Sequence, residues 1–247
     1  MLSFHWETIL LLWASGLLGG VAPLLVKWDT TYLHHLLALG TGMLLATVFY
    51  HMLPEATTNS FSITILLIGL LAIFLVEYVI FPRVSFGGEG SSRDRHLLVG
   101  NTAYLGLSFH AFAAGIGLAI TLSDPSLRAI IVSVMIIHKI SEALSLSAIL
   151  LLAEFSVALR WGLIILFSFI TPLGILLGGL GATVLSGKWF EGATGFAAGT
   201  FLYITLCDLL PEVFHPPTKR LLNFILLLIG IIAGGFYLIW SGNPVGH

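Results

Sequence analysis

Charged residues are scarce in this sequence: Lys, Arg, Asp and Glu together make up only 9% of its 247 residues. Hydrophobic residues make up 57%, and the mean hydropathy is +1.04. This composition excludes an ordinary soluble domain and predicts an integral membrane protein built from helices. The net charge of −2 gives no sign of a nucleic-acid partner, and none is expected.

Cysteine is nearly absent as well, because Cys207 is the single one in the chain. One thiol rules out an intramolecular disulfide and a zinc site built from several cysteines. The first seven residues hold no Lys or Arg, so the basic region of a signal peptide is missing. The apolar run that follows is therefore expected to remain as a membrane span.

Long apolar runs dominate what is present, and each is long enough to cross a bilayer as a helix. The eight runs are roughly 7–26, 33–54, 61–82, 100–122, 126–153, 160–185, 191–213 and 220–240. No segment is large enough for a soluble domain, so we expect one transmembrane domain over 1–247. The longest join is rich in Gly and Ser and predicts a flexible loop at about 83–99.

Lys and Arg are distributed unevenly between the two sets of joins. Seven lie in the joins from odd to even spans, and two lie on the opposite side. Because basic loops stay in the cytoplasm, this bias places those joins inside and both termini outside. We therefore expect a multi-pass protein of the cell (inner) membrane, in contact with the lipid bilayer.

A short repeat links two distant spans. Residues 42–55 align without gaps on 199–212, with Gly, Leu, Pro and Glu recurring in register. One copy lies on span 2 and the other on span 7, so the copies cross the membrane in opposite directions. This pattern is typical of the inverted repeats of transporters. It predicts a 3+2+3 arrangement in which spans 1–3 and 6–8 surround spans 4 and 5.

Polar residues occupy the end of each repeat copy. His51 and Glu55 close the first copy and are expected near the outer surface, whereas Asp208 and Glu212 close the second near the inner surface. Ionisable side chains at both mouths suit an entrance and an exit for a cation. Ordinary interfacial polar residues at helix ends are the alternative, and for Glu55 and Glu212 it is nearly as strong.

Spans 4 and 5 carry the most informative residues. His138 and Glu142 are four apart, so a helix places them on one face, where an imidazole and a carboxylate can hold a divalent metal. His110 lies on span 4, and the turn at 123–125 separates it from His138 by about fourteen residues on either side. At about 1.5 Å rise per residue both reach the same depth, near mid-membrane. The spacing predicts a three-ligand metal site.

These residues together resemble the Zrt/Irt-like (ZIP) family of divalent metal transporters. The resemblance rests on His110, His-Lys-Ile-Ser-Glu-Ala at 138–143, His-Met-Leu-Pro-Glu-Ala at 51–56 and Asp-Leu-Leu-Pro-Glu at 208–212, in order along nearly the whole chain. It implies uptake of zinc or a related cation towards the cytoplasm, an elevator-like movement of spans 4 and 5, and a homodimer in many members. It also implies Met43 as a fourth metal ligand.

The chain departs from the family pattern at the metal site. The usual His-Asn-x-Pro-Glu-Gly of span 4 is His-Ala-Phe-Ala-Ala-Gly at 110–115, and Lys139 stands where a second metal ligand is usual. We therefore expect one metal site instead of two, with Lys139 bordering the transport path or taking the place of the second metal. The nitrogen-rich ligand set favours Zn²⁺ over Mn²⁺ and leaves Fe²⁺, Co²⁺ and Cd²⁺ open.

Transport is the leading hypothesis, and three alternatives remain open. A zinc-dependent intramembrane hydrolase would need a general base besides the ligands, and Glu142 is the only nearby candidate. A haem protein would use His110 and His138 as axial ligands. A metal sensor would bind the ion without moving it. The inverted repeat and the polar groups at both mouths favour a transporter, which is not an enzyme.

Overall fold

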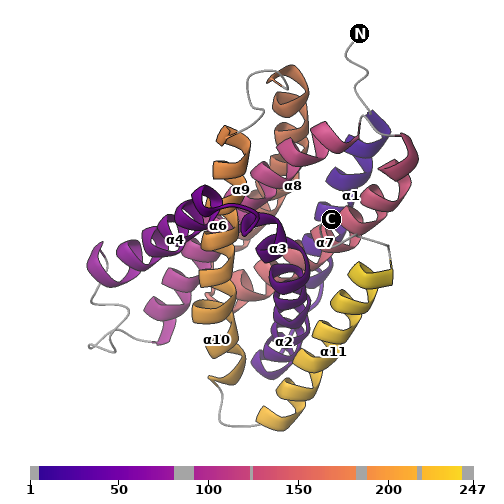
Figure 1. The fold of residues 1–247 in the computed structure, drawn as a ribbon. Helices are drawn as coiled ribbons and strands as arrows, with labels where there is room; N and C mark the ends of the chain where they lie inside the picture. The colour runs from indigo at the N-terminus through magenta and orange to yellow at the C-terminus, as the bar shows by residue number, and fades with distance from the viewer. Residues whose placement is uncertain (1–5, 81–91, 123–124, 182–187, 216–218, 241–247) are drawn as a thin grey trace.

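The computed structural model describes residues 6–80, 92–122, 125–181, 188–215 and 219–240. Within these residues every element is helical (Figure 1), so the predicted all-α architecture is confirmed. Seven helical segments are long and apolar enough to cross a membrane, and a shorter apolar segment covers Arg220–Phe236. The chain is an integral, multi-pass membrane protein.

The helices follow the eight predicted spans closely. In chain order they are α1 (Trp6–Leu24), α2 (Thr30–Thr47), η1 (Val48–Met52), α3 (Leu53–Ala56), α4 (Ser60–Phe74), η2 (Leu75–Ile80), α6 (Ser92–Thr121), α7 (Pro125–Leu152), α8 (Val157–Gly181), α9 (Lys188–Tyr203), η3 (Ile204–Leu209), α10 (Leu210–Phe214) and α11 (Arg220–Trp240), where η marks a π-helix. Spans 2 and 7 each join an α-helix, a π-helix and a short α-helix. Span 3 joins α4 and η2.

The fourth span begins earlier than predicted. Part of the expected loop at 83–99 is helical, because α6 starts at Ser92. Polar residues mark where the apolar stretch ends, but Arg and Leu are good helix formers and do not stop a helix. Residues 81–91 of the predicted loop lie outside the described residues.

The sequence repeat is preserved in the backbone hydrogen bonds of spans 2 and 7. The N–H of Leu53 donates to the carbonyl of Val48, and the N–H of Leu210 donates to that of Thr205. Both bonds reach back five residues, at equivalent positions of the two copies. Each bond lies just before the proline of its copy. Proline carries a bulky ring and has no backbone N–H, and the wider π turn accommodates it.

Helix pairing extends the inverted repeat into the centre of the molecule. α2 packs against α11 as α9 packs against α4, and α1 packs against α7 as α8 packs against α6. Exchanging spans 1 with 6, 2 with 7, 3 with 8 and 4 with 5 converts each pair into its counterpart. The relation therefore includes spans 4 and 5, α6 and α7, which carry the predicted metal ligands.

Glycines allow two of these pairs to approach closely. A Cβ added to Gly42 of α2 would lie 3.0 Å from the Cα of Gly230 on α11. A Cβ added to Gly115 of α6 would lie 3.0 Å from the Cα of Gly174 on α8. Such contacts between backbones are how membrane helices associate without a hydrophobic driving force. The contact of Gly115 with Gly174 helps to set the position of α6 along α8, and therefore the depth of His110 in the bundle.

Many large apolar side chains are exposed on the described part of the helix bundle. On α4 the large exposed side chains are Phe61, Ile63, Leu67, Ile68, Leu71 and Phe74. Exposed side chains of this kind are expected where a helix faces lipid tails instead of water. The polar side chains of the predicted site lie inside the bundle.

Candidate metal site

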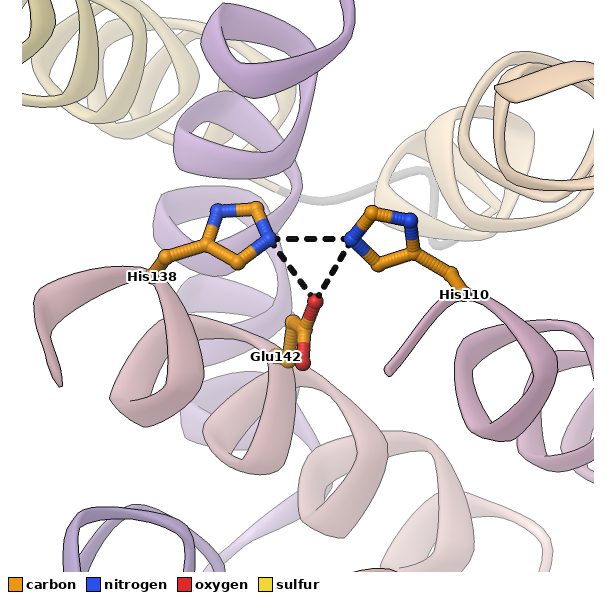
Figure 2. Close-up of side chains that lie close together, drawn as sticks. All are labelled: His110, His138 and Glu142. Atoms are coloured by element: carbon orange, nitrogen blue, oxygen red, sulfur yellow. Dashed lines mark hydrogen bonds and ion pairs between the residues drawn. The ribbon is translucent and has the colours of Figure 1, made fainter. Parts of the chain in front are cut away.

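Three predicted ligands meet inside the bundle, although they come from two helices. His110 lies on α6, and His138 and Glu142 lie one turn apart on α7, so all three side chains point to one place (Figure 2). The two Nε2 atoms are 3.1 Å apart. Glu142 Oε1 lies 2.8 Å from His138 Nε2 and 3.2 Å from His110 Nε2. All three residues are buried. Below we call them the central triad.

The triangle of ligand atoms has the dimensions that a small divalent cation requires. Zinc bonds of about 2.0–2.1 Å in tetrahedral geometry place neighbouring ligand atoms about 3.3 Å apart. The three edges of the central triad, between 2.8 and 3.2 Å, are close to that separation. Two imidazole nitrogens and a carboxylate oxygen at these distances bring lone pairs together, which favours a positive charge between them.

Thr47 of α2 orients the ring of His138. Its Oγ1 lies 3.2 Å from the carbonyl oxygen of Met43 and 3.0 Å from His138 Nδ1. The hydroxyl donates to the carbonyl and accepts from the Nδ1–H, which leaves the Nε2 lone pair directed at the central triad. Hydrogen bonds of this kind to the second ring nitrogen are usual for metal-binding histidines.

Replacing Thr47 by valine should therefore weaken Zn²⁺ binding. The valine keeps the shape of the side chain but removes the acceptor, and losses of roughly 10- to 100-fold in affinity are typical of such contacts. Thr41→Val is the matched control, since Thr41 is buried on the same helix and its hydroxyl has no hydrogen-bond partner among the described residues. Zinc titration of the purified protein checks the prediction, and equal affinities for the two variants would contradict it.

An aromatic ring closes one side of the site. Phe201 of α9 is fully buried, and its ring centre lies 4.6 Å from that of His110 and 6.5 Å from that of His138. The ring excludes water from this side and restricts the orientation of both imidazoles. A dry environment of this kind strengthens electrostatic attraction between ligands and a cation.

Lys139 uses the second oxygen of the Glu142 carboxylate. Its Nζ lies 3.4 Å from Oε2, on the other side of the carboxylate from the imidazoles, and 3.7 Å from the centre of the Phe167 ring. A carboxylate and an aromatic face are both suitable partners for an ammonium group. The side chain is 1% exposed. Glu142 therefore contacts the two histidines with Oε1 and the side-chain amine of Lys139 with Oε2.

Met43 lies beside the central triad. Its Sδ accepts a hydrogen bond from Ser141 Oγ at 3.4 Å, one residue before Glu142 on α7. The role of Met43 as a metal ligand stays a prediction.

The axial-haem alternative does not fit the central triad, because two nitrogens on opposite sides of one iron would be about 4 Å apart with a macrocycle between them. The observed separation is 3.1 Å.

The structure describes the side chains of three of the four predicted mouth residues, and they differ in burial. His51 lies in η1 and is half-buried, and its place at the outer mouth stays a prediction. The side chain of Glu55 lies outside the described part of the structure. Asp208 is buried, with its Oδ2 3.3 Å from Thr102 Oγ1. Glu212 is fully buried and contacts two histidines that were not predicted to be functional.

Those histidines are His34 and His96, and sequence reasoning missed them together with Thr47 and Phe201. Thr47 stands one helical turn after Met43, but its contact with His138 joins different helices, as do the contacts that the other three make with the predicted residues. His34 offered one signal, because it is a polar residue near the start of an apolar run.

Comparison with known proteins agrees with this architecture. A family model described as "ZIP Zinc transporter" matches residues 87–238, more than half of the chain. Zinc transporter ZIP1 of Mus musculus is 41% identical over 121 residues, covering 46% of this chain and 36% of the relative. Zinc transporter ZIP1 of Takifugu rubripes is 31% identical over 130 residues, covering 51% and 43%.

A plant relative extends the match further along the chain. Zinc transporter 9 of Oryza sativa subsp. japonica is 30% identical over 161 residues, covering 60% of this chain and 44% of the relative. The alignments thus span less than half the length of these curated relatives. The family match includes α6 and α7, with all three residues of the central triad. This chain belongs to the ZIP zinc transporter family.

Proposed function

We propose that this protein carries a divalent metal cation, in the first place Zn²⁺, across the membrane towards the cytoplasm. The ion would bind near the membrane midplane to His110, His138 and Glu142. The observation that carries the proposal is the convergence of two imidazole nitrogens and a carboxylate oxygen, 2.8–3.2 Å apart, inside a bundle of apolar helices. Ionisable groups at such a depth cost free energy and are retained for function.

Polar groups on both sides of the central triad support movement of the ion instead of permanent binding. His51 lies on η1 and Asp208 on η3, the two π-helical segments of the inverted repeat. The same exchange of spans relates α6 to α7, so a site between them can open to either side by similar movements of the two halves. The relatives in the comparison are named zinc transporters, which agrees with this reading.

The ligand set also limits the choice of ion. Imidazole suits Zn²⁺, Cu²⁺, Fe²⁺ and Ni²⁺, whereas Mg²⁺, Ca²⁺ and Mn²⁺ prefer oxygen ligands. The central triad offers two nitrogens and one oxygen, with Met43 as a further soft ligand beside it. We therefore place Zn²⁺ first, keep Fe²⁺, Co²⁺ and Cd²⁺ as further substrates, and place Mn²⁺ behind them.

We infer the direction of transport and the orientation of the chain in the membrane from the basic joins. The excess of Lys and Arg in the odd-to-even joins puts these joins in the cytoplasm and both termini outside. The ion would then enter past His51 and Glu55 and leave past Asp208 and Glu212. The cell membrane is the proposed location, with a homodimer as the proposed assembly, as in many members of the family.

Metal uptake into liposomes that contain the purified protein tests the proposal. We expect saturable Zn²⁺ uptake that Cd²⁺ and Co²⁺ inhibit by competition, with Mn²⁺ a weaker competitor. Liposomes without protein provide the background. Tight Zn²⁺ binding without flux would contradict transport and would favour the sensor or hydrolase alternative.

A further inference from the structure

A second group of metal-ligating side chains lies at the end of the bundle formed by the first turns of α2 and α6 and by α10. Glu212 Oε1 lies 2.9 Å from His96 Nε2 and 3.5 Å from His34 Nε2. The Glu212 side chain is fully buried, and His34 is buried as well. Figure 1 shows the start of α2 and the end of α10 near each other, by the start of α11.

Hydrogen bonding prepares His34 for a ligand. Its Nδ1 lies 2.7 Å from the carbonyl oxygen of Thr30, one helical turn earlier, and donates its proton to that oxygen. The remaining nitrogen, Nε2, then has a lone pair that is directed towards Glu212. An imidazole held by a backbone carbonyl in this way is the usual arrangement of a metal-binding histidine.

The neighbouring histidine, His35, differs from His34 because it takes part in hydrogen bonds between helices and does not face Glu212. His35 Nδ1 lies 2.6 Å from Asn223 Oδ1, and Asn223 Nδ2 donates to the carbonyl oxygen of Val213 at 2.7 Å. This chain of bonds ties α2 to α11 and α10, beside the carboxylate. His35 therefore braces the helix ends around Glu212, whereas His34 faces the carboxylate.

We propose that His34, His96 and Glu212 form a second binding site for a divalent cation, separate from the central triad. Two imidazoles and one carboxylate are the same ligand set as in the central triad, and they suit the same ion, Zn²⁺. By the predicted orientation the second site lies at the cytoplasmic end. Its role as the last binding position before release rests on the proposed transport function, whereas the binding itself does not.

The second site should bind more weakly than the central triad. Among the described residues, only the central triad brings one atom of each of three such ligands within 4.8 Å of the other two. The ligands of the second site are more widely spaced and must move together to hold an ion. Weak binding is what release into the cytoplasm requires, because an ion must also be able to leave.

Zinc stoichiometry of the untagged, purified full-length protein tests the inference. By equilibrium dialysis against a series of free Zn²⁺ concentrations, we expect two ions per chain with affinities at least tenfold apart. His34→Gln and His96→Gln should each lose the weaker ion and keep the tighter one. His138→Ala should lose the tighter one and keep the weaker. Thr41→Val, also on α2 but with no hydrogen-bond partner among the described residues, is the control and should keep both.

The opposite results separate this inference from the proposed function. One ion per chain in the unmodified protein, or two ions in both His34→Gln and His96→Gln, would overturn the second site. Glu212→Gln covers the case in which a histidine variant fails to fold, because it keeps the side-chain shape and should also bind one ion. Two bound ions without flux in liposomes would instead contradict transport and leave the second site standing.

Discussion

In liposomes containing the His138→Ala variant, saturable Zn²⁺ uptake should fall to background. His138 Nε2 forms two of the three edges of the central triad, at 3.1 Å from His110 Nε2 and 2.8 Å from Glu142 Oε1. Loss of a ligand should cost more than loss of the hydrogen bond that orients it, which typically costs roughly 10- to 100-fold in affinity. We therefore expect a decrease beyond roughly 100-fold.

A replacement that keeps a metal ligand gives the control for this experiment. His138→Cys offers a thiolate, which binds zinc well, and should retain part of the uptake that His138→Ala loses. Equal amounts of folded protein in the liposomes are checked by size-exclusion chromatography before reconstitution. Uptake by His138→Ala within twofold of the unmodified protein would show that the central triad is not on the transport path.

Replacing Glu142 by alanine should both abolish zinc binding at the central triad and destabilise the fold. The substitution removes the carboxylate from the triad and leaves Lys139, 1% exposed, with the Phe167 ring as its remaining described partner. Breaking a buried ion pair by removing one member costs about 3–5 kcal/mol, since the other charge stays buried. The thermal unfolding temperature in detergent micelles measures this loss.

A double variant separates the two effects. In Lys139→Met/Glu142→Gln both charges are absent and both side-chain shapes are nearly kept, so the unfolding temperature should return close to that of the unmodified protein. Zinc uptake should remain absent, because the triad still lacks its carboxylate. Glu7→Ala, which removes an exposed acid of α1, is the control and should change neither property. An unfolding temperature of Glu142→Ala equal to that of the control would contradict the buried ion pair.

Local patterns predicted much of this molecule. The eight apolar runs gave the spans, and a spacing of four residues on one helix placed His138 beside Glu142. Counting back from the turn at 123–125 placed His110 at the same depth, and the Nε2 atoms of the two histidines lie 3.1 Å apart. These features depend on helical geometry within one hairpin, which sequence spacing describes well.

Contacts between distant helices were beyond that reasoning. Thr47 and Phe201 border the central triad because α2 and α9 turn particular faces towards α6 and α7. His34, His96 and Glu212 come from spans 2, 4 and 7 and meet at one end of the bundle. The rotation of each helix follows from packing at small residues such as Gly42, which no local pattern reports.

The single carboxylate shared by the histidines and Lys139 has an electrical consequence. With neutral imidazoles, Glu142 and an ammonium at Lys139 sum to zero, so a bound Zn²⁺ leaves the loaded site with an excess of two positive charges. Moving one elementary charge through a membrane potential is worth about 2.3 kcal/mol per 100 mV, and therefore about 4.6 kcal/mol for two. In the proposed cycle, a negative interior voltage would pull the loaded site inward and exert no net force on its empty return.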